Sequence, residues 1–355
     1  MAPPIEPMLA ASAEALPAGD GWLYEPKWDG FRAVVFRGAV DVFIQSRDLR
    51  PLDRYFPELH EACLAQVPAG CVLDGEIVIV TAHGLDFDAL QLRLHPAASR
   101  VAMLAKATPA AFVAFDLLAV DGRDVRTASQ ADRRRLLEGV LGRAARPLYL
   151  TPVTPDHATA LVWLREFEGA GLDGVIAKPA RGTYQPGRRA MIKVKHARTA
   201  DCAVAGFRWH KSGADAVGSL LLGLYDERRA LHHVGVTSAF PMAARKELAR
   251  ELAPLRRGAL DHHPWRDWAT PDAGGLVRMP GGQSRWSAGK DLSWEPLRIE
   301  RVCEVKYDHL QGRRFRHAAL FLRWRPDKRP ADCRYDQLEV TAPFELAKVF
   351  GVSGR

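Results

Sequence analysis

The stretch Glu25-Pro26-Lys27-Trp28-Asp29-Gly30-Phe31-Arg32 carries the strongest chemical signal in this chain. It places a lysine two residues before an Asp-Gly pair, with an arginine close behind. A lysine amine attacks phosphorus only without its extra proton, so a nucleophilic lysine needs burial or nearby positive charge to lower its pKa. The flanking rings of Trp28 and Phe31 favour partial burial of Lys27. A lone lysine is more often a solvated surface residue, so the rest of the chain must supply its partners.

The composition indicates two domains and a polyanionic partner. The chain has 355 residues, which is long for a single hydrophobic core. Lys and Arg outnumber Asp and Glu, and the formal net charge of +8 favours nucleic acid through phosphate contacts. A GC-rich genome would also enrich a chain in arginine, so charge alone does not decide the partner.

The cysteines and the N-terminal residues indicate a reducing cytoplasm. The five cysteines form no Cys-x-x-Cys pair and no cluster with histidine, which argues against a zinc site and a disulfide framework. The N-terminus shows no signal-peptide pattern, and no apolar run is long enough to span a bilayer. We therefore expect a cytoplasmic protein that is not associated with a membrane.

Strand and helix patterns predict two structural halves. The runs 34–36 and 42–44 flank Gly38 and predict a hairpin directly after the lysine stretch. The first half should also contain strands at 72–80, 111–118, 175–177 and 191–195 and helices at 132–141 and 159–168. The second half should contain strands at 202–209, 219–225, 231–236, 303–307 and 319–324 and a helix at 241–255. Such short strands with one inserted helix are compatible with a small OB-type barrel.

Several polar residues of the first half suit a nucleotide. Asp74-Gly75-Glu76 lies in the run 72–80, which is otherwise made of aliphatic residues. Glu76 there needs a cation, a ligand hydroxyl or a metal as a partner, unless it occupies a solvated strand face. Lys193 and Lys195 alternate with apolar residues on one strand face. Two neighbouring ammonium groups indicate an anion between them, and a polyphosphate is the natural candidate.

Four further positions are candidates on residue type. Arg32 and Arg47 could hold phosphate or ribose oxygens, and Phe115 at the end of a strand could stack on a purine. Asp173 offers an oxygen ligand for a hard cation. Each also has an ordinary interpretation as a surface charge or a core residue.

In their order along the chain, these motifs resemble those of the covalent nucleotidyltransferases, which comprise DNA ligases, RNA ligases and mRNA capping enzymes. Lys27-Trp28-Asp29-Gly30 is similar to family motif I, Asp74-Gly75-Glu76 to motif III, Phe115-Asp116 to motif IIIa, Asp173-Gly174-Val175-Ile176 to motif IV and Lys193-Val194-Lys195 to motif V. Arg325-Pro326-Asp327-Lys328 resembles motif VI, which family members carry on an OB domain. Motif IV usually begins with glutamate, so Asp173 departs from the family pattern, and its shorter side chain could weaken a metal contact.

The resemblance implies an α+β protein. An ATP-grasp-like nucleotidyltransferase (adenylation) domain of antiparallel sheets and helices is expected at residues 1–198, and a C-terminal OB-fold β-barrel at 199–355. The implied reaction has three steps: Lys27 takes AMP from ATP and releases pyrophosphate, the AMP passes to a 5′-phosphate at a nick, and the 3′-hydroxyl displaces it. Mg²⁺, or Mn²⁺, would lie near Glu76 and Asp173.

The resemblance also implies a role for each candidate residue. Glu25 would read adenine, largely through its backbone, and Phe115 would stack on the base. Arg32 and Glu76 would contact ribose or the nick, Lys193 and Lys195 would hold the α-phosphate, and Arg325, Asp327 and Lys328 belong to the motif that orients pyrophosphate in the first step only. The OB domain would therefore close and reopen.

Within the family, the chain looks most like bacterial ATP-dependent DNA ligases of the LigC and LigD type. ATP is preferred over NAD⁺ because the scattered cysteines do not supply the zinc module of NAD⁺-dependent ligases. We expect a nucleoid-associated monomer that seals nicked double-stranded DNA in repair, with Ku or a primase-polymerase as partners suggested by resemblance alone. The alternatives are an RNA-end ligase with the same first step, a GTP-using capping enzyme and a nucleic-acid-binding protein with a decayed transferase domain.

Overall fold

The chain divides into two compact units. The computed structural model describes residues 1–81, 84–196, 198–268, 293–308, 310–338 and 344–349. Unit 1 comprises Met1–His196 and Thr341–Arg355, and unit 2 comprises Ala197–Val340. The boundary lies close to the predicted one at residue 198. The C-terminal helix α7 (Leu346–Val349) belongs to unit 1, so unit 2 ends earlier than the predicted range of 199–355.

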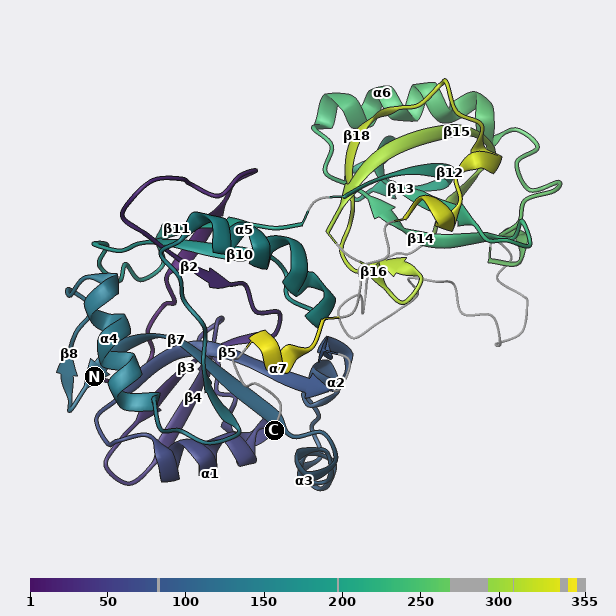
Figure 1. Cartoon of the computed structure of the whole chain (residues 1–355). Helices are drawn as coiled ribbons and strands as arrows, with labels where there is room; N and C mark the ends of the chain where they lie inside the picture. Colours follow the sequence, from purple (N-terminus) through teal and green to yellow (C-terminus); the bar gives the residue numbers. More distant parts are fainter. Residues whose placement is uncertain (82–83, 197, 269–292, 309, 339–343, 350–355) are drawn as a thin grey trace. The chain divides into compact units, whose positions relative to one another are not determined.

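A seven-stranded sheet forms the centre of unit 1 (Figure 1). Its strands are β3 (Phe31–Arg37), β4 (Val42–Ser46), β5 (Val72–Thr81), β6 (Gly84–Leu85), β7 (Ala110–Val120), β8 (Arg123–Asp124) and β9 (Leu148–Leu150). The order is β4-β3-β5-β7-β8, with β6 beside β5 and β9 beside β7, and every pairing is antiparallel except β7 with β9. The predicted hairpin and the strands expected at 72–80 and 111–118 are confirmed.

Both faces of this sheet are buried. On β3, Ala33 and Val35 pack into a core that includes Leu59 of the helix α1 (Pro57–Gln66). Val34 and Phe36 project to the other face and pack into a second core. This two-sided burial explains why β3 is written as a nearly continuous apolar run, since alternating polar residues mark a sheet with one solvated face.

A smaller sheet covers the second face. It consists of β1 (Leu9–Ser12), β11 (Arg189–Val194), β10 (Val175–Pro179) and β2 (Trp22–Pro26), in that order. β1 runs parallel to β11, and the other pairs are antiparallel. Met191 and Ile176 of this sheet pack with Val34 and Phe36, which places the two sheets face to face with a core between them.

The remaining described helices of unit 1 are α2 (Phe87–Leu92), α3 (Ala98–Ala107), α4 (Gln130–Leu141) and α5 (His157–Glu166). The predicted helices at 132–141 and 159–168 correspond to α4 and α5. α5 begins after Asp156, whose carboxylate accepts a hydrogen bond from the backbone N–H of Thr159 at 2.8 Å, a typical N-cap. Among the described residues, no helix is both long and apolar enough to cross a membrane.

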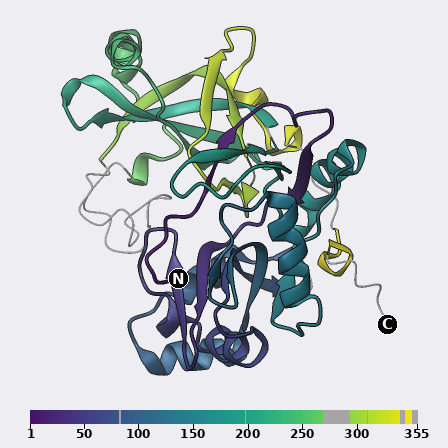
Figure 2. The same cartoon turned by 90° about the vertical axis from the view of Figure 1, so that its left-hand side faces the viewer.

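Unit 2 is an antiparallel barrel with an external helix. Its strands are β12 (Arg198–His210), β13 (Gly213–Tyr225), β14 (Leu231–Thr237), β15 (Glu295–Tyr307) and β18 (Leu320–Trp324), with the short pair β16 (Leu310–Gln311) and β17 (Arg314–Phe315) beside them. The order is β14-β13-β12-β15-β18, and a bridge between Thr237 and Ala319 joins the two ends. The helix α6 (Met242–Leu252) lies outside the barrel in both views (Figure 1 and Figure 2). The closed five-stranded arrangement agrees with the predicted OB-type barrel.

Candidate active site

The backbone of Lys27 is fixed to the segment that precedes β10. Lys27 lies between β2 and β3, where its N–H donates to the carbonyl of Gly174 at 2.8 Å and its carbonyl accepts from the N–H of Asp173 at 2.9 Å. Gly174 has a φ of +133°, and a Cβ at this position would lie 2.1 Å from the carbonyl oxygen of Val194. Only glycine permits this approach, and it brings motifs I, IV and V together.

The side chain of Lys27 forms an ion pair in this site. Its Nζ lies 2.5 Å from Oδ2 of Asp173, and the same oxygen lies 2.8 Å from Nζ of Lys195. Burial raises the pKa of Asp173, but the two ammonium groups outweigh it and hold that pKa below its ordinary value. Trp28 is buried, and its indole N–H donates to the hydroxyl of Thr151 at 2.8 Å. The expected partial burial of the lysine stretch is therefore present.

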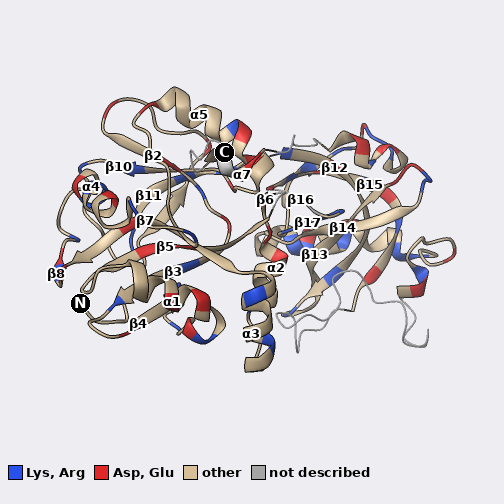
Figure 3. Cartoon of the chain, turned by 60° about the horizontal axis from the view of Figure 1, so that its bottom comes forward, with Lys and Arg blue, Asp and Glu red and all other residues tan. Residues whose placement is uncertain are grey.

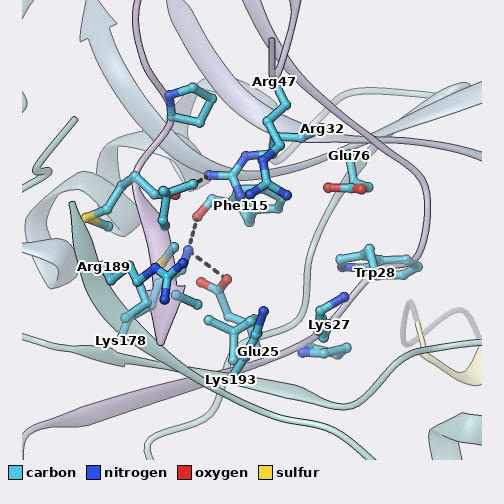
Figure 4. Close-up of a pocket in the computed structure, with 17 residues that line it drawn as sticks. Glu25, Lys27, Trp28, Arg32, Arg47, Glu76, Phe115, Lys178, Arg189 and Lys193 are labelled. Atoms are coloured by element: carbon cyan, nitrogen blue, oxygen red, sulfur yellow. Dashed lines mark hydrogen bonds and ion pairs between the residues drawn. The ribbon is translucent and has the colours of Figure 1, made fainter. Parts of the chain in front are cut away.

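A pocket opens beside Lys27 and gathers most of the predicted residues (Figure 4). Its lining includes Glu25, Lys27, Arg32, Arg47, Glu76, Phe115 and Lys193. Asp173 and Lys195 connect to it through the ion pairs with and around Lys27. Residues that are far apart in the sequence thus meet in one place.

One side of the pocket contains a buried ion pair that sequence reasoning missed. Glu25 and Lys178 are each 2% exposed, and Oε2 of Glu25 lies 2.8 Å from Nζ of Lys178. Lys178 also donates to the carbonyl of Phe115 at 2.9 Å (Figure 4). Burial raises the pKa of Glu25, and Lys178 opposes this effect. The sequence held a signal for Lys178, because it lies two residues after Ile176 on β10. Residues two apart on a strand share a face, and Ile176 lines the pocket.

The ring of Phe115 contacts two cations. The guanidinium carbon of Arg32 lies 4.5 Å from the ring centroid, and Nζ of Lys178 lies 4.9 Å from it. These are cation–π distances. Stacking of Phe115 on a purine therefore stays a prediction, with the ring already held between charged neighbours.

Arg32 is fixed from below by a buried carboxylate. Asp74 is completely buried, and its two oxygens accept from Nε and Nη2 of Arg32, each at 2.6 Å. The hydroxyl of Tyr184 donates to the same carboxylate at 2.7 Å. A fork of this kind sets the plane of the guanidinium group. Tyr184 was not predicted, since it lies outside every motif.

The pocket also concentrates positive charge. The side chains of Lys193 and Arg47 make no hydrogen bond or ion pair with any residue that the structure describes. Desolvation first, and then Lys27, Lys195 and Arg47, lower the pKa of Lys193. Figure 3 shows the basic positions of β3 and β10 and the acidic positions of β5 around this part of unit 1. Four cations that share a single nearby carboxylate, Asp173, fit a polyphosphate.

Glu76 is the carboxylate best suited to a cation. Burial raises its pKa to about 7, although Arg32 and Lys27 oppose the change. It has no ion-pair partner among the residues the structure describes, whereas Asp173 already serves two ammonium groups. No cluster of three or more His, Cys, Asp or Glu ligands occurs in the described part of the chain. A magnesium ion at Glu76 would therefore complete its shell with phosphate oxygens and water, as this ion commonly does.

The motif VI residues lie in unit 2, after β18. Both oxygens of Asp327 accept from Arg325, the shortest distance being 2.7 Å to Nη2. Arg325 Nη1 also lies 2.9 Å from Oδ1 of Asp201, and Lys328 forms an ion pair with the same carboxylate. Asp201 was not predicted as a site residue.

Comparisons with known proteins agree with the motifs. Residues 7–195 match the ATP dependent DNA ligase domain, and residues 213–328 match the ATP dependent DNA ligase C terminal region. DNA ligase C2 of Mycolicibacterium smegmatis is 58% identical over 95% of this chain and 95% of its own length. DNA ligase C of Mycobacterium tuberculosis is 56% identical over 98% of this chain and 97% of its own length.

A solved structure supports the fold. A Lig E DNA ligase superposes with a TM-score of 0.56 over 90% of this chain and 100% of that chain, at 16% identity. Its likeness confirms the predicted architecture of a nucleotidyltransferase domain followed by an OB-fold domain. From its matched domains and its relatives, the chain belongs to the ATP-dependent DNA ligases.

Proposed function

We propose that this ligase seals nicks with 3′-hydroxyl and 5′-phosphate ends in duplex DNA through an AMP group carried on Lys27. The observation that carries the proposal is the position of Lys27. Its Nζ lies at the wall of the pocket, beside Asp173 and close to the cations around Lys193. A nucleophile so placed meets a bound triphosphate at its α-phosphorus when the base lies near Glu25.

The first step breaks one bond and forms one bond. Nζ of Lys27 loses one proton to water before it attacks the α-phosphorus and a second as the N–P bond forms, and the bond from that phosphorus to the bridging oxygen of the β-phosphate breaks. Pyrophosphate leaves, and Lys193 and Arg47 are placed to balance the negative charge of the phosphates. Such in-line substitutions depend on positioning and charge neutralisation. Mg²⁺ bound near Glu76 would supply further neutralisation of phosphate charge.

The Glu25 side of the pocket supports ATP as the nucleotide. Oε1 of Glu25 is buried and has no hydrogen-bond partner among the described residues. An unpaired buried acceptor is costly, so it favours a ligand that donates a hydrogen bond. The 6-amino group of adenine would supply such a donor.

The later steps pass AMP to the DNA and release it. The 5′-phosphate at the nick attacks the lysyl-AMP phosphorus and frees Lys27, and the 3′-hydroxyl then displaces AMP to form the phosphodiester. We assign Arg32 to the nucleotide or nick side of this site, because Asp74 and Tyr184 fix its guanidinium group at the pocket wall. Asp173 stays a candidate metal ligand, although its oxygen is engaged by Lys27 and Lys195.

The test is covalent labelling. The protein is incubated with Mg²⁺ and α-labelled ATP or GTP, after intact mass has established whether it already carries AMP. Label from ATP should stay on the denatured wild type and should be lost from Lys27→Ala. Lys246→Ala is the matched control, because Lys246 is a half-exposed lysine that pairs with Asp215 in unit 2.

The outcomes separate the alternatives. Label that survives Lys27→Ala would reject Lys27 as the nucleophile, and label from GTP would indicate capping chemistry. Competition between nicked DNA and RNA ends would then distinguish a DNA ligase from an RNA-end ligase.

A role in DNA repair near the nucleoid is part of this proposal. It is supported by the net charge of +8 and by the resemblance of the motifs to LigC-type and LigD-type ligases. Ku and a primase-polymerase are candidate partners from that resemblance alone.

A further inference from the structure

One buried carboxylate in unit 2 holds two cations of motif VI. Oδ1 and Oδ2 of Asp201 lie 2.9 Å and 3.1 Å from Nη1 of Arg325, and Lys328 donates to Oδ2. Asp201 is 7% exposed. It belongs to β12, far in sequence from the residues that it binds. Two positive side chains are thus oriented by one acid that lies outside every recognised motif.

The backbone of Asp201 is itself clamped. Its N–H donates to Oε1 of Gln337 at 2.8 Å, and Nε2 of Gln337 donates back to its carbonyl at 3.1 Å. Asp201 also faces Glu304 of β15 in the barrel register, and Glu304 lies 3.7 Å from Arg325. These contacts leave the Asp201 carboxylate little freedom to follow the cations, so the cations must adapt to it.

The exposures of the motif VI side chains follow from this arrangement. The Arg325 side chain is 16% exposed, whereas those of Lys328 and Asp327 are 38% and 58% exposed. Arg325 connects the buried Asp201 to the exposed Asp327 by donating hydrogen bonds to both carboxylates. Arg325 therefore serves as the anchor, and the other two present polar groups to solvent.

We propose that Asp201 is a positioning residue for the first step of ligation, which orders Arg325, Asp327 and Lys328 as one preformed unit for the pyrophosphate end of ATP. The inference rests on the proposed function and on the resemblance of the motifs, which assigns motif VI to the first step. Asp201 acts through its partners and does not touch the nucleotide. Loss of such positioning typically costs up to about 100-fold in rate even when the chemistry is unchanged.

The experiment compares wild type with Asp201→Asn, which keeps the shape and removes the charge. Three quantities are measured: the rate of AMP transfer from ATP to the protein, the pyrophosphate concentration that half-saturates reversal of that transfer, and the sealing rate of a nick that already carries AMP. We expect the first to fall 10- to 100-fold, the second to rise at least tenfold, and the third to change by no more than about twofold. A purely structural defect would not move the pyrophosphate dependence while sparing the third quantity.

Controls keep the outcomes distinct. Asp332→Asn removes an exposed acid that pairs with Arg329 and should leave all three quantities unchanged. If Asp201→Asn does not fold, Asp201→Glu, which keeps the charge but displaces it, must show the same division between steps. Equal loss of all three quantities, or loss of none, would overturn the role of Asp201. Absence of label on wild type, or label that persists in Lys27→Ala, would instead reject the proposed function.

Discussion

Replacing Glu76 by glutamine should stabilise unit 1 while it impairs the enzyme. Glu76 lies on β5, whose other residues are mostly buried and, apart from Asp74 and Thr81, apolar. Burial raises its pKa from 4.5 to about 7. The folded protein therefore resists ionisation of this group more than the unfolded chain does. Glutamine has nearly the same shape and never ionises, so Glu76→Gln removes this effect alone.

The sign and size follow from proton linkage. Below pH 4.5 the carboxyl is largely protonated in both states, and it costs the folded state nothing. Above pH 7 it is ionised in both states, and the folded state bears the full penalty. Because one pKa unit corresponds to about 1.4 kcal/mol, the penalty is about 3 kcal/mol at pH 8 and about 1 kcal/mol at pH 5. The stability of the wild type is thus lost as pH rises through this window.

The assay must report on unit 1 by itself. Native-state hydrogen exchange of β5 peptides, measured by mass spectrometry in EDTA without nucleotide, gives the free energy of opening of this region. Glu76→Gln should exceed wild type by about 3 kcal/mol at pH 8 and by about 1 kcal/mol at pH 5. Glu61→Gln, an exposed glutamate on α1, should differ from wild type by less than about 0.5 kcal/mol at either pH.

A pH-independent difference between Glu76→Gln and wild type would refute this reasoning, because a packing effect of the amide does not titrate. Direct observation of the Glu76 carboxyl by carbon NMR offers a second check. A midpoint near 4.5 would show that the site solvates the carboxylate and that no cation is needed there. In either case we expect Glu76→Gln to slow AMP transfer at least tenfold, since the site loses its least engaged carboxylate.

Three further changes have defined outcomes. Gly30→Ala places a Cβ 2.1 Å from the carbonyl oxygen of Ile77, so it should destabilise unit 1 by about 1–3 kcal/mol in thermal unfolding. Gly139→Ala is the control: a Cβ there meets nothing within 4 Å, and the change should be neutral or mildly stabilising. Lys178→Met leaves a buried carboxylate without its partner and should raise the KM for ATP at least tenfold; an unchanged KM would place the base elsewhere. Leu346→Ala should lower the stability of unit 1 by about 2 kcal/mol, because α7 packs into its core, and no change would contradict that contact.

The central strands could be predicted because their pattern is strong. The runs that became β3, β5 and β7 are rich in valine, leucine and phenylalanine and are bounded by glycine or polar residues. β2 was missed, although it carries Glu25, because five residues ending in proline form too short a pattern. α1 was missed even though Pro57 stands at its first position, a recognised start signal.

The site residues likewise divide into those with a strong local sequence pattern and those without one. Lys27, Glu76 and Lys193 could be assigned because each lies in a motif whose residues are adjacent in the sequence. Lys178 and Asp201 could not, because each acts through a partner that only the fold brings near. The sequence pattern indicates which residues are neighbours along a strand. A buried ion pair between distant segments is visible in the sequence only as one charged residue in an apolar run.

The charge distribution of the pocket explains why its acidic and basic residues occur together. Oε2 of Glu25 is paired with Lys178, so the charge of this carboxylate is balanced. Its buried Oε1 has no partner among the described residues and is free to accept a hydrogen bond from a ligand. Desolvation first, and then Lys27, Lys195 and Arg47, lower the pKa of Lys193, which means that the folded protein holds this charge at a cost. We therefore propose that a triphosphate would lower that cost and that its adenine would satisfy the free oxygen of Glu25, an orientation that would present the α-phosphate to Lys27.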